Sequence, residues 1–166
     1  QKNRVVFPLN FDKKVLVIVA HPDDEVLGAG GLIHSIASQD VEVSIAIVSP
    51  RSIKSRPGID DSYVQDLLHQ AKVASDILGA KELCFGEFEN ELTAERETEV
   101  NLWVERLVNE VNPNTILTHP GKELHNDHNL VSKAVSIASR PRGGKKSINV
   151  IQFEPIGAYP SMEFWP

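Results

Sequence analysis

Residues 15–20 (VLVIVA) form a continuous apolar run, and residues 21–25 (HPDDE) follow it directly with a histidine and three acids. An uninterrupted run rich in β-branched residues is typical of a strand that is buried on both faces of a sheet. In open α/β sheets, ligands bind beyond the carboxyl ends of such strands. The stretch therefore predicts a helix-covered parallel sheet with a functional site at the end of its first strand.

The rest of the chain alternates between strands and helices. Further strands are expected at residues 41–48, 82–85, 115–118 and 148–153. Helices are expected at residues 26–38, 62–78, 93–111 and 127–139. This alternation predicts the α/β class, as a three-layer α/β/α, Rossmann-like fold with a mostly parallel sheet of about five strands. We expect residues 1–166 to form a single domain.

The composition is that of an ordinary globular protein, and it argues against two classes of partner. The net charge of −6 provides no basic face for nucleic acid. No apolar stretch approaches the roughly 18 residues that a membrane-spanning helix needs. The single cysteine, Cys84, fits a reducing compartment. We therefore expect a cytoplasmic protein, and a homo-oligomer is compatible with the sequence.

The cluster at residues 21–25 contains side chains that bind metals. Histidine and aspartate are zinc ligands, and three protein ligands with one open position mark a catalytic zinc site. The alternative is helix capping, in which Asp23 or Asp24 begins the following helix and the helix dipole favours the neighbouring acids. The motif alone does not decide between these two interpretations.

A second cluster, residues 125–128 (HNDH), follows the strand expected at residues 115–118. Its two histidines are three residues apart, so one helical turn can present both to the same centre. The acid between them can orient a histidine through a hydrogen bond. The alternative is a solvated polar turn. If the first and fourth strands are neighbours, however, the two clusters meet at the switch in strand order and form one metal site.

Two further groups of residues are candidates for substrate binding. His119 ends the fourth strand before Pro120, where it would line the pocket. The long loop at residues 51–61 carries Arg51, Lys54 and Arg56. These cations either belong to a solvated loop or hold a phosphate or carboxylate of the substrate, such as that of a nucleotide sugar.

Taken together, these residues resemble the PIG-L or LmbE-like N-deacetylase family. The resemblance rests on residues 20–25 (AHPDDE), the glycines that follow them and residues 125–128, and it extends from about residue 15 to the end of the chain. Asn112-Pro113 and Phe153-Glu154 also fit the pattern. Residues 160–164 (PSMEF) stand where relatives often read Ser-Ser-Thr-Glu-Trp, which makes Glu163 a candidate substrate contact.

The resemblance implies a zinc enzyme that removes the N-acetyl group from an amino sugar or an amino-sugar conjugate. By motif position, His21, Asp24 and His128 would be the Zn²⁺ ligands and Asp23 the general base. His125 would polarise the amide carbonyl and stabilise the oxyanion. Asp127 would hold a histidine in its useful protonation state.

The chain also departs from the family pattern. Relatives often carry Arg and Glu on the second helix, where this chain has Leu67 and Gln70. Ser49-Pro50-Arg51 stands where relatives often read Thr-Asp-Gly. Members generally continue well beyond the Phe153-Glu154 segment, so we expect a C-terminally truncated domain or a short variant that lacks part of the pocket wall.

Three other functions compete with sugar deacetylation. A Mg²⁺-dependent phosphohydrolase would use Asp23, Asp24 and Glu25, but magnesium prefers oxygen ligands and the paired histidines favour zinc. A zinc amidase acting on another acyl group or a thiol conjugate would use the same metal chemistry. A non-catalytic domain that binds metal or sugar is the third alternative, because a fold alone does not fix a function.

Overall fold

The computed structural model describes residues 11, 13–141 and 147–153. Their five strands form one sheet in the order β3-β2-β1-β4-β5, and every pair of neighbours is parallel. The strands are β1 (Lys14–Val19), β2 (Glu42–Ile47), β3 (Glu82–Phe85), β4 (Thr115–Thr118) and β5 (Asn149–Gln152). The predicted parallel sheet is confirmed, and its central strand is the apolar run that the sequence singles out.

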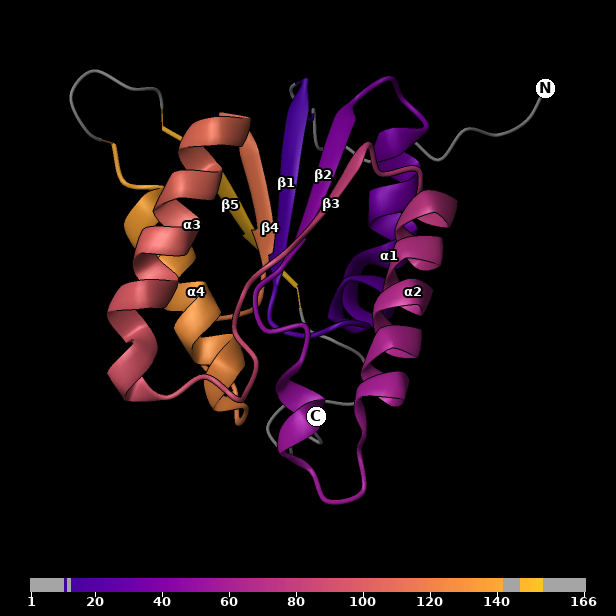
Figure 1. The fold of residues 1–166 in the computed structure, drawn as a ribbon. Coiled ribbons are helices and arrows are strands. Elements are labelled where there is room, and N and C mark those ends of the chain that lie inside the picture. Colours follow the sequence, from indigo (N-terminus) through magenta and orange to yellow (C-terminus); the bar gives the residue numbers. More distant parts are fainter. Residues whose placement is uncertain (1–10, 12, 142–146, 154–166) are drawn as a thin grey trace, which may run out of the picture.

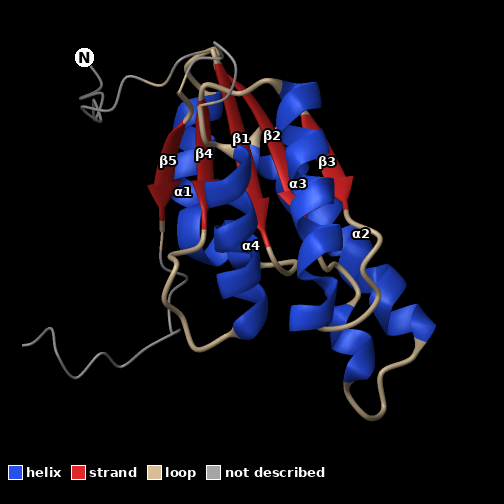
Figure 2. Cartoon of the chain, turned by 90° about the vertical axis from the view of Figure 1, so that its left-hand side faces the viewer, coloured by secondary structure: helices blue, strands red, loops and turns tan. Residues whose placement is uncertain are grey.

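Helices cover both faces of the sheet, which confirms the three-layer prediction (Figures 1 and 2). On one face lie α1 (Asp24–Ala37) and α2 (Asp61–Leu78), and on the other lie α3 (Glu97–Val111) and α4 (Asn126–Ala138). Two short 3₁₀ helices interrupt the loops, η1 (Ser52–Ser55) and η2 (Ala94–Arg96). Within the described part of the chain, no helix is long and apolar enough to cross a membrane.

Two segments differ in kind from the sequence-based expectation, beyond shifts of one or two residues at the element ends. The helix expected at residues 93–111 is an α-helix only from Glu97, and its first turn is η2. The side chain of Thr93 makes no capping hydrogen bond, so the first turn tightens into 3₁₀ geometry instead. The loop expected to be irregular at residues 51–61 contains η1.

The side chains of β1 alternate between two apolar cores. Leu16 and Ile18 pack into the core under α3 and α4, while Val15, Val17 and Val19 pack into the core under α1 and α2. All five side chains have no exposed surface. A strand that is buried on both sides cannot shift its register without exposing one set, so β1 fixes the position of the residues that follow it.

Glycine is required at two places along β3 and the helix before it. Gly79 ends α2 with a φ of 82°, a left-handed conformation that side chains disfavour. Gly86 follows β3 and lies so close to β2 that an added Cβ atom would be 2.0 Å from the carbonyl oxygen of Val48. The loop after β3 therefore starts in direct contact with the end of β2.

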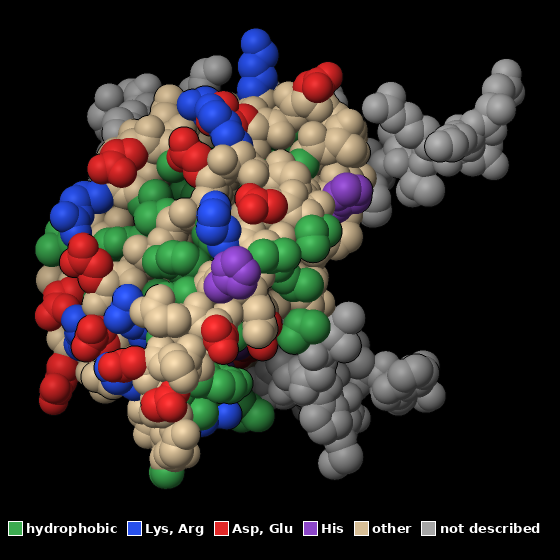
Figure 3. Space-filling view, turned by 45° about the vertical axis from the view of Figure 1, so that its right-hand side comes forward, with side chains coloured by type: hydrophobic (Ala, Val, Ile, Leu, Met, Phe, Trp, Pro, Cys, Tyr) green, Lys and Arg blue, Asp and Glu red, His purple; other side chains and the backbone are tan. Residues whose placement is uncertain are grey.

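Charge is distributed rather than concentrated on the face shown in Figure 3. There, acidic, basic and apolar side chains of the described residues are interspersed. The apolar side chains on the surface include Leu27, Ile77 and Leu102, which are 51%, 70% and 55% exposed. Single exposed apolar side chains of this kind are common on folded proteins.

We predict opposite effects for two glycine-to-alanine substitutions. Gly86→Ala should lower the free energy of unfolding by about 1–3 kcal/mol, because the new methyl group overlaps the Val48 carbonyl. Gly31→Ala should raise it by about 0.5–1 kcal/mol, because Gly31 lies inside α1 and its added Cβ meets nothing within 4 Å. Urea unfolding of both variants measures this, and effects of equal sign would contradict the packing described.

Candidate active site

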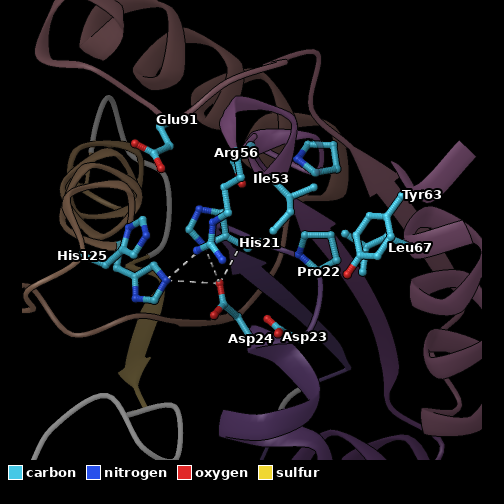
Figure 4. Close-up of a pocket in the computed structure, with 13 residues that line it drawn as sticks. His21, Pro22, Asp23, Asp24, Ile53, Arg56, Tyr63, Leu67, Glu91 and His125 are labelled. Atoms are coloured by element: carbon cyan, nitrogen blue, oxygen red, sulfur yellow. Dashed lines mark hydrogen bonds and ion pairs between the residues drawn. The ribbon is translucent and has the colours of Figure 1, made fainter. Parts of the chain in front are cut away.

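The two sequence clusters meet where the order of the strands reverses. Residues 20–25 leave the carboxyl end of β1, and residues 119–128 follow β4, which pairs with β1 from Val15↔Thr115 to Ile18↔Thr118. Side chains from both segments, among them His21, Asp24 and His128, line one pocket (Figure 4). The adjacency on which the sequence argument depended is therefore present.

Three donor atoms form a nearly equilateral triangle at the centre of the site. His21 Nδ1 lies 3.6 Å from Asp24 Oδ2 and 3.3 Å from His128 Nε2, and His128 Nε2 lies 3.4 Å from Asp24 Oδ2. Three ligands at about 2.0–2.2 Å from a tetrahedral zinc ion lie about 3.3–3.6 Å from one another. The triangle thus has the size that a zinc ion requires.

The outer nitrogen of each imidazole in the triangle contacts a buried carboxylate. His21 Nε2 lies 2.9 Å from Asp127 Oδ2, and His128 Nδ1 contacts Glu123 Oε2. The side chains of Asp127 and Glu123 are each only 2% exposed. Such contacts fix the ring orientation and leave the inner nitrogen with its lone pair, as is common in metal sites.

His119 lies behind the triangle and does not line the pocket. It has no exposed surface, and its ring stacks on that of His128 with centroids 3.9 Å apart and an interplanar angle of 6°. Its Nε2 lies 3.3 Å from Asp24 Oδ2 and accepts a hydrogen bond from Ala20 N. His119, which we expected to line the pocket, therefore contacts Asp24 behind it.

The orientation of the rings also bears on which side chains could hold a metal. Asp24, His119 and His128 could in principle hold a metal, as could His21, His125 and His128. An imidazole lone pair lies in the plane of its ring, so two nearly parallel stacked rings cannot direct their lone pairs at one point. The rings of His21 and His128 are tilted by 45° and can do so.

Helix α1 does not begin with a capping side chain. Asp23 occupies the N-cap position with a φ of 108°, and its side chain makes no capping hydrogen bond. The side chain of Asp24 accepts a hydrogen bond from the backbone of His21, at 2.8 Å, instead of capping the helix. Both carboxylates are thus free of the capping role. The positive φ of a non-glycine residue at this position is the kind of strain found at functional sites.

The acids of the first cluster have very different environments. Burial acts to raise the pKa of Asp24, but contacts with His119 and His128 outweigh it and hold that pKa well below its usual range. Burial and the charge of Asp24 raise the pKa of Asp23. Burial raises the pKa of Glu25 to about 7, although backbone groups donate hydrogen bonds to it. Divergent environments of adjacent acids are what acid–base chemistry needs.

His125 is placed to donate a hydrogen bond into the pocket. It caps α4, because its Nδ1 accepts a hydrogen bond from Asp127 N at 3.3 Å. Burial and the neighbouring imidazoles of His21 and His128 lower the pKa of His125, which favours its neutral form. In that form Nδ1 is the acceptor and the proton resides on Nε2.

The pocket has a volume of about 330 Å³ and two kinds of wall. One side consists of the donor triangle together with Asp23 and His125. The side toward α2 is apolar and is lined by Pro22, Ile53, Tyr63 and Leu67. The other charged residues that line the pocket are Arg56 and Glu91. Within the described part of the chain, neither of them has an ion-pair partner. A polar ligand would meet one donor and one acceptor at this rim.

The cations of the loop after β2 have separate surroundings. Arg51 lies 4.0 Å from Glu89 and lines a neighbouring cavity, while Lys54 pairs with Asp61 at 2.8 Å. Arg56 alone of the three lines the active-site pocket. The fourth expected substrate contact, Glu163, lies outside the described residues.

Glu91 stands on a loop that is anchored on both sides. The hydroxyl of Ser49 donates to Asn90 O at 2.8 Å. Leu92 N donates to Asp127 Oδ1 at 3.0 Å, and Leu92 O accepts from Asn126 at 2.9 Å. The carboxylate that orients His21 therefore also positions the loop that carries Glu91.

The site also contains Glu91 and Glu123, which the sequence patterns did not indicate. Glu91 is one of three acids in residues 87–91 (EFENE) and lacks a motif of its own. Glu123 stands five residues before His128 in a loop that also contains Lys122. Its spacing from the second cluster was the available signal, since a metal-binding histidine commonly has a carboxylate partner.

The family model described as GlcNAc-PI de-N-acetylase, PIG-L, matches residues 16–139, which include both clusters. The chain belongs to the PIG-L family. A probable N-acetyl-alpha-D-glucosaminyl L-malate deacetylase 2 of Bacillus cereus is 28% identical over 149 residues, covering 84% of this chain and 68% of the relative.

Solved structures of similar fold include enzymes of two reaction types. The N,N'-diacetylchitobiose deacetylase from Pyrococcus horikoshii has a TM-score of 0.68 and 19% identity, covering 85% of this chain and 60% of the other. GalB, the 4-carboxy-2-hydroxymuconate hydratase from Pseudomonas putida, has a TM-score of 0.64 and 24% identity, covering 87% and 66%. These two likenesses show the fold. This PIG-L chain spans 60–68% of the lengths of the three proteins compared.

The buried Glu25 predicts a pH-dependent stability in the metal-free protein. Its folded-state pKa of about 7 exceeds the ordinary 4.5, so the folded protein loses stability as pH rises through this interval. The Glu25→Gln variant has no carboxyl group at this position, so it does not lose this stability as the pH rises. The variant should therefore gain up to about 3 kcal/mol relative to wild type between pH 5 and pH 8.

Urea unfolding at the two pH values, with a chelator present, measures this gain. Glu95→Gln on η2 removes the same charge at an exposed position and serves as the control. A stability difference between Glu25→Gln and wild type that stays constant with pH would contradict the raised pKa.

Proposed function

We propose that the protein is a zinc-dependent hydrolase that removes the N-acetyl group from an amino sugar or an amino-sugar conjugate. The observation that carries the proposal is the triangle of His21 Nδ1, Asp24 Oδ2 and His128 Nε2, with sides of 3.3–3.6 Å, at the mouth of a pocket. Its two nitrogens and one oxygen match zinc better than magnesium, which prefers oxygen ligands. Membership of the PIG-L family supports the reaction type.

These three residues would hold the ion and leave room for substrate. When bound, Zn²⁺ would polarise the acetyl carbonyl and lower the pKa of water toward roughly 7. Asp127 and Glu123 keep the two imidazoles in the tautomer that binds a metal, because each contacts the outer ring nitrogen.

Asp23 is suited to carry the proton of the reaction. It is exposed at the rim of the pocket beside Asp24, and its side chain makes no capping hydrogen bond. Its carboxylate takes a proton as water forms a C–O bond to the acetyl carbon. It then delivers that proton to the amine nitrogen as the C–N bond breaks, so that acetate and a free amino sugar leave.

His125 supplies a hydrogen-bond donor for the oxyanion. Because its Nδ1 accepts from the backbone of Asp127, the neutral ring presents Nε2–H to the pocket that it lines. A fixed donor aimed at the carbonyl oxygen stabilises the charge that develops there. His125 needs no proton transfer of its own for this role.

Arg56 and Glu91 are the groups that would select the substrate. Glu91 can accept from sugar hydroxyls, and Arg56 can pair with a carboxylate or phosphate on a conjugate. The two deacetylases compared above are named for an N-acetylglucosaminyl malate and for diacetylchitobiose. Only the first substrate carries carboxylates, so the charge of Arg56 favours an acidic conjugate.

The proposal predicts about one zinc per chain and acetate release that a chelator abolishes. Asp23→Asn should keep its zinc and lose about 10²–10⁴-fold in kcat, because the proton carrier is missing. His128→Ala should lose zinc and activity together, because one side of the donor triangle is gone. Metal analysis and acetate release from N-acetylglucosamine and its conjugates measure both effects.

Each result separates the proposal from a rival. Wild-type turnover by Asp23→Asn would refute the role of the general base. Zinc bound without acetate release from any N-acetyl sugar would favour another acyl substrate, a hydration reaction or a non-catalytic domain. A protein that binds no zinc would refute the proposal as a whole.

Selection by Arg56 predicts a difference between two substrates. Arg56→Ala should lower kcat/KM for N-acetylglucosaminyl malate at least 10-fold, since a charge-assisted hydrogen bond contributes about 1.5–3 kcal/mol. It should change kcat/KM for diacetylchitobiose much less. Lys54→Ala is the matched control, because Lys54 lies on the same loop, pairs with Asp61 and does not line the pocket. Equal losses on both substrates would count against an anion site.

A further inference from the structure

His128 is held between two carboxylates that approach its two ring nitrogens. Nε2 lies 3.4 Å from Asp24 Oδ2 inside the donor triangle, and Nδ1 contacts Glu123 Oε2 on the outside. The contact with Glu123 sets the ring rotation and favours the tautomer that carries its proton on Nδ1. The lone pair of Nε2 then points into the triangle.

Glu123 is itself fixed by the helix that carries His128. Asn129, the next residue of α4, binds both backbone groups of Glu123 through its side-chain amide. Its Oδ1 accepts from Glu123 N at 2.9 Å, and its Nδ2 donates to Glu123 O at 2.6 Å. One turn of α4 thus carries the candidate ligand and the clamp for that ligand's carboxylate partner.

The placement of Glu123 is unfavourable for the stability of the metal-free protein. Its side chain is 2% exposed, and Oε1 is buried without a hydrogen-bond partner among the described residues. By contrast, the second oxygen of Asp127 accepts a hydrogen bond from Leu92 N. A buried carboxylate with one unpaired oxygen costs stability, and the other acids of the site add like-charge repulsion.

We propose that Glu123, clamped by Asn129, is a positioning residue whose role is to make His128 Nε2 a strong metal ligand, at the expense of the stability of the metal-free protein. The inference rests on the proposed function, because it assumes that the triangle holds zinc. It goes beyond that function by assigning a role to Asn129 and by giving Glu123 opposite effects on metal affinity and on metal-free stability. A residue with a purely structural role would affect stability and metal affinity in the same direction.

The experiment compares zinc affinity and metal-free stability in the same variants. Zinc is stripped from the wild-type protein, Glu123→Gln, Asn129→Ala and the exposed control Glu95→Gln. The dissociation constant for Zn²⁺ is measured by competition with a chromophoric chelator, and the melting temperature is measured without metal. Removing a carboxylate partner of a metal-binding histidine typically weakens metal binding about 10–100-fold.

We expect Glu123→Gln to bind zinc about 10–100-fold more weakly while its metal-free form melts no lower than wild type. Asn129→Ala should show a smaller loss of affinity, because it releases the clamp but keeps the carboxylate. Glu95→Gln should match wild type in both measurements.

Two outcomes would overturn the inference. One is a Glu123→Gln variant with wild-type zinc affinity, and the other is a loss of affinity accompanied by a lower melting temperature of the metal-free protein. The wild-type measurement keeps the two proposals distinguishable, because a wild-type protein that binds no zinc refutes the proposed function before any variant is compared.

Discussion

The parallel pairing of β1 with β4 is the interaction on which the site depends. β1 is buried on both faces, so its register is fixed by two apolar cores at once. β4 takes its register from β1, and the segments that follow the two strands must therefore meet. His21 and His128 are more than a hundred residues apart, yet their facing nitrogens lie 3.3 Å from each other because of this pairing.

The carboxylates around these histidines orient the imidazole rings, and they also lower the stability of the metal-free protein. Asp24, Asp127 and Glu123 each contact an imidazole, while Glu25 is buried beside them with one oxygen unpaired. Without a cation, the site concentrates negative charge in a region of low exposure. A divalent ion would relieve that repulsion, so its binding would be coupled to folding at this edge of the sheet.

The sequence predicts what depends on local pattern and misses what depends on loop conformation. Apolar runs located all five strands, because a helix-covered strand has few alternatives. The convergence of the two clusters remained conditional, since strand order cannot be read from one chain. The loop cations Arg51 and Arg56 looked equivalent until η1 directed one of them away from the pocket. Nothing in the sequence indicates that Asn129 holds the backbone of Glu123, because this contact depends on the loop conformation.

The fold alone does not decide which reaction it performs. A deacetylase and a hydratase share this architecture, so the sheet and its crossovers do not specify the chemistry. In this chain the pocket wall comes from the loops after β2 and β3, from Pro22 and from the start of α2. Ser49, Asn126 and Asp127 hold the second loop in place through backbone groups of Asn90 and Leu92. Because Asp127 contacts both His21 and the backbone of Leu92, one carboxylate connects the loop that carries Glu91 to the donor triangle.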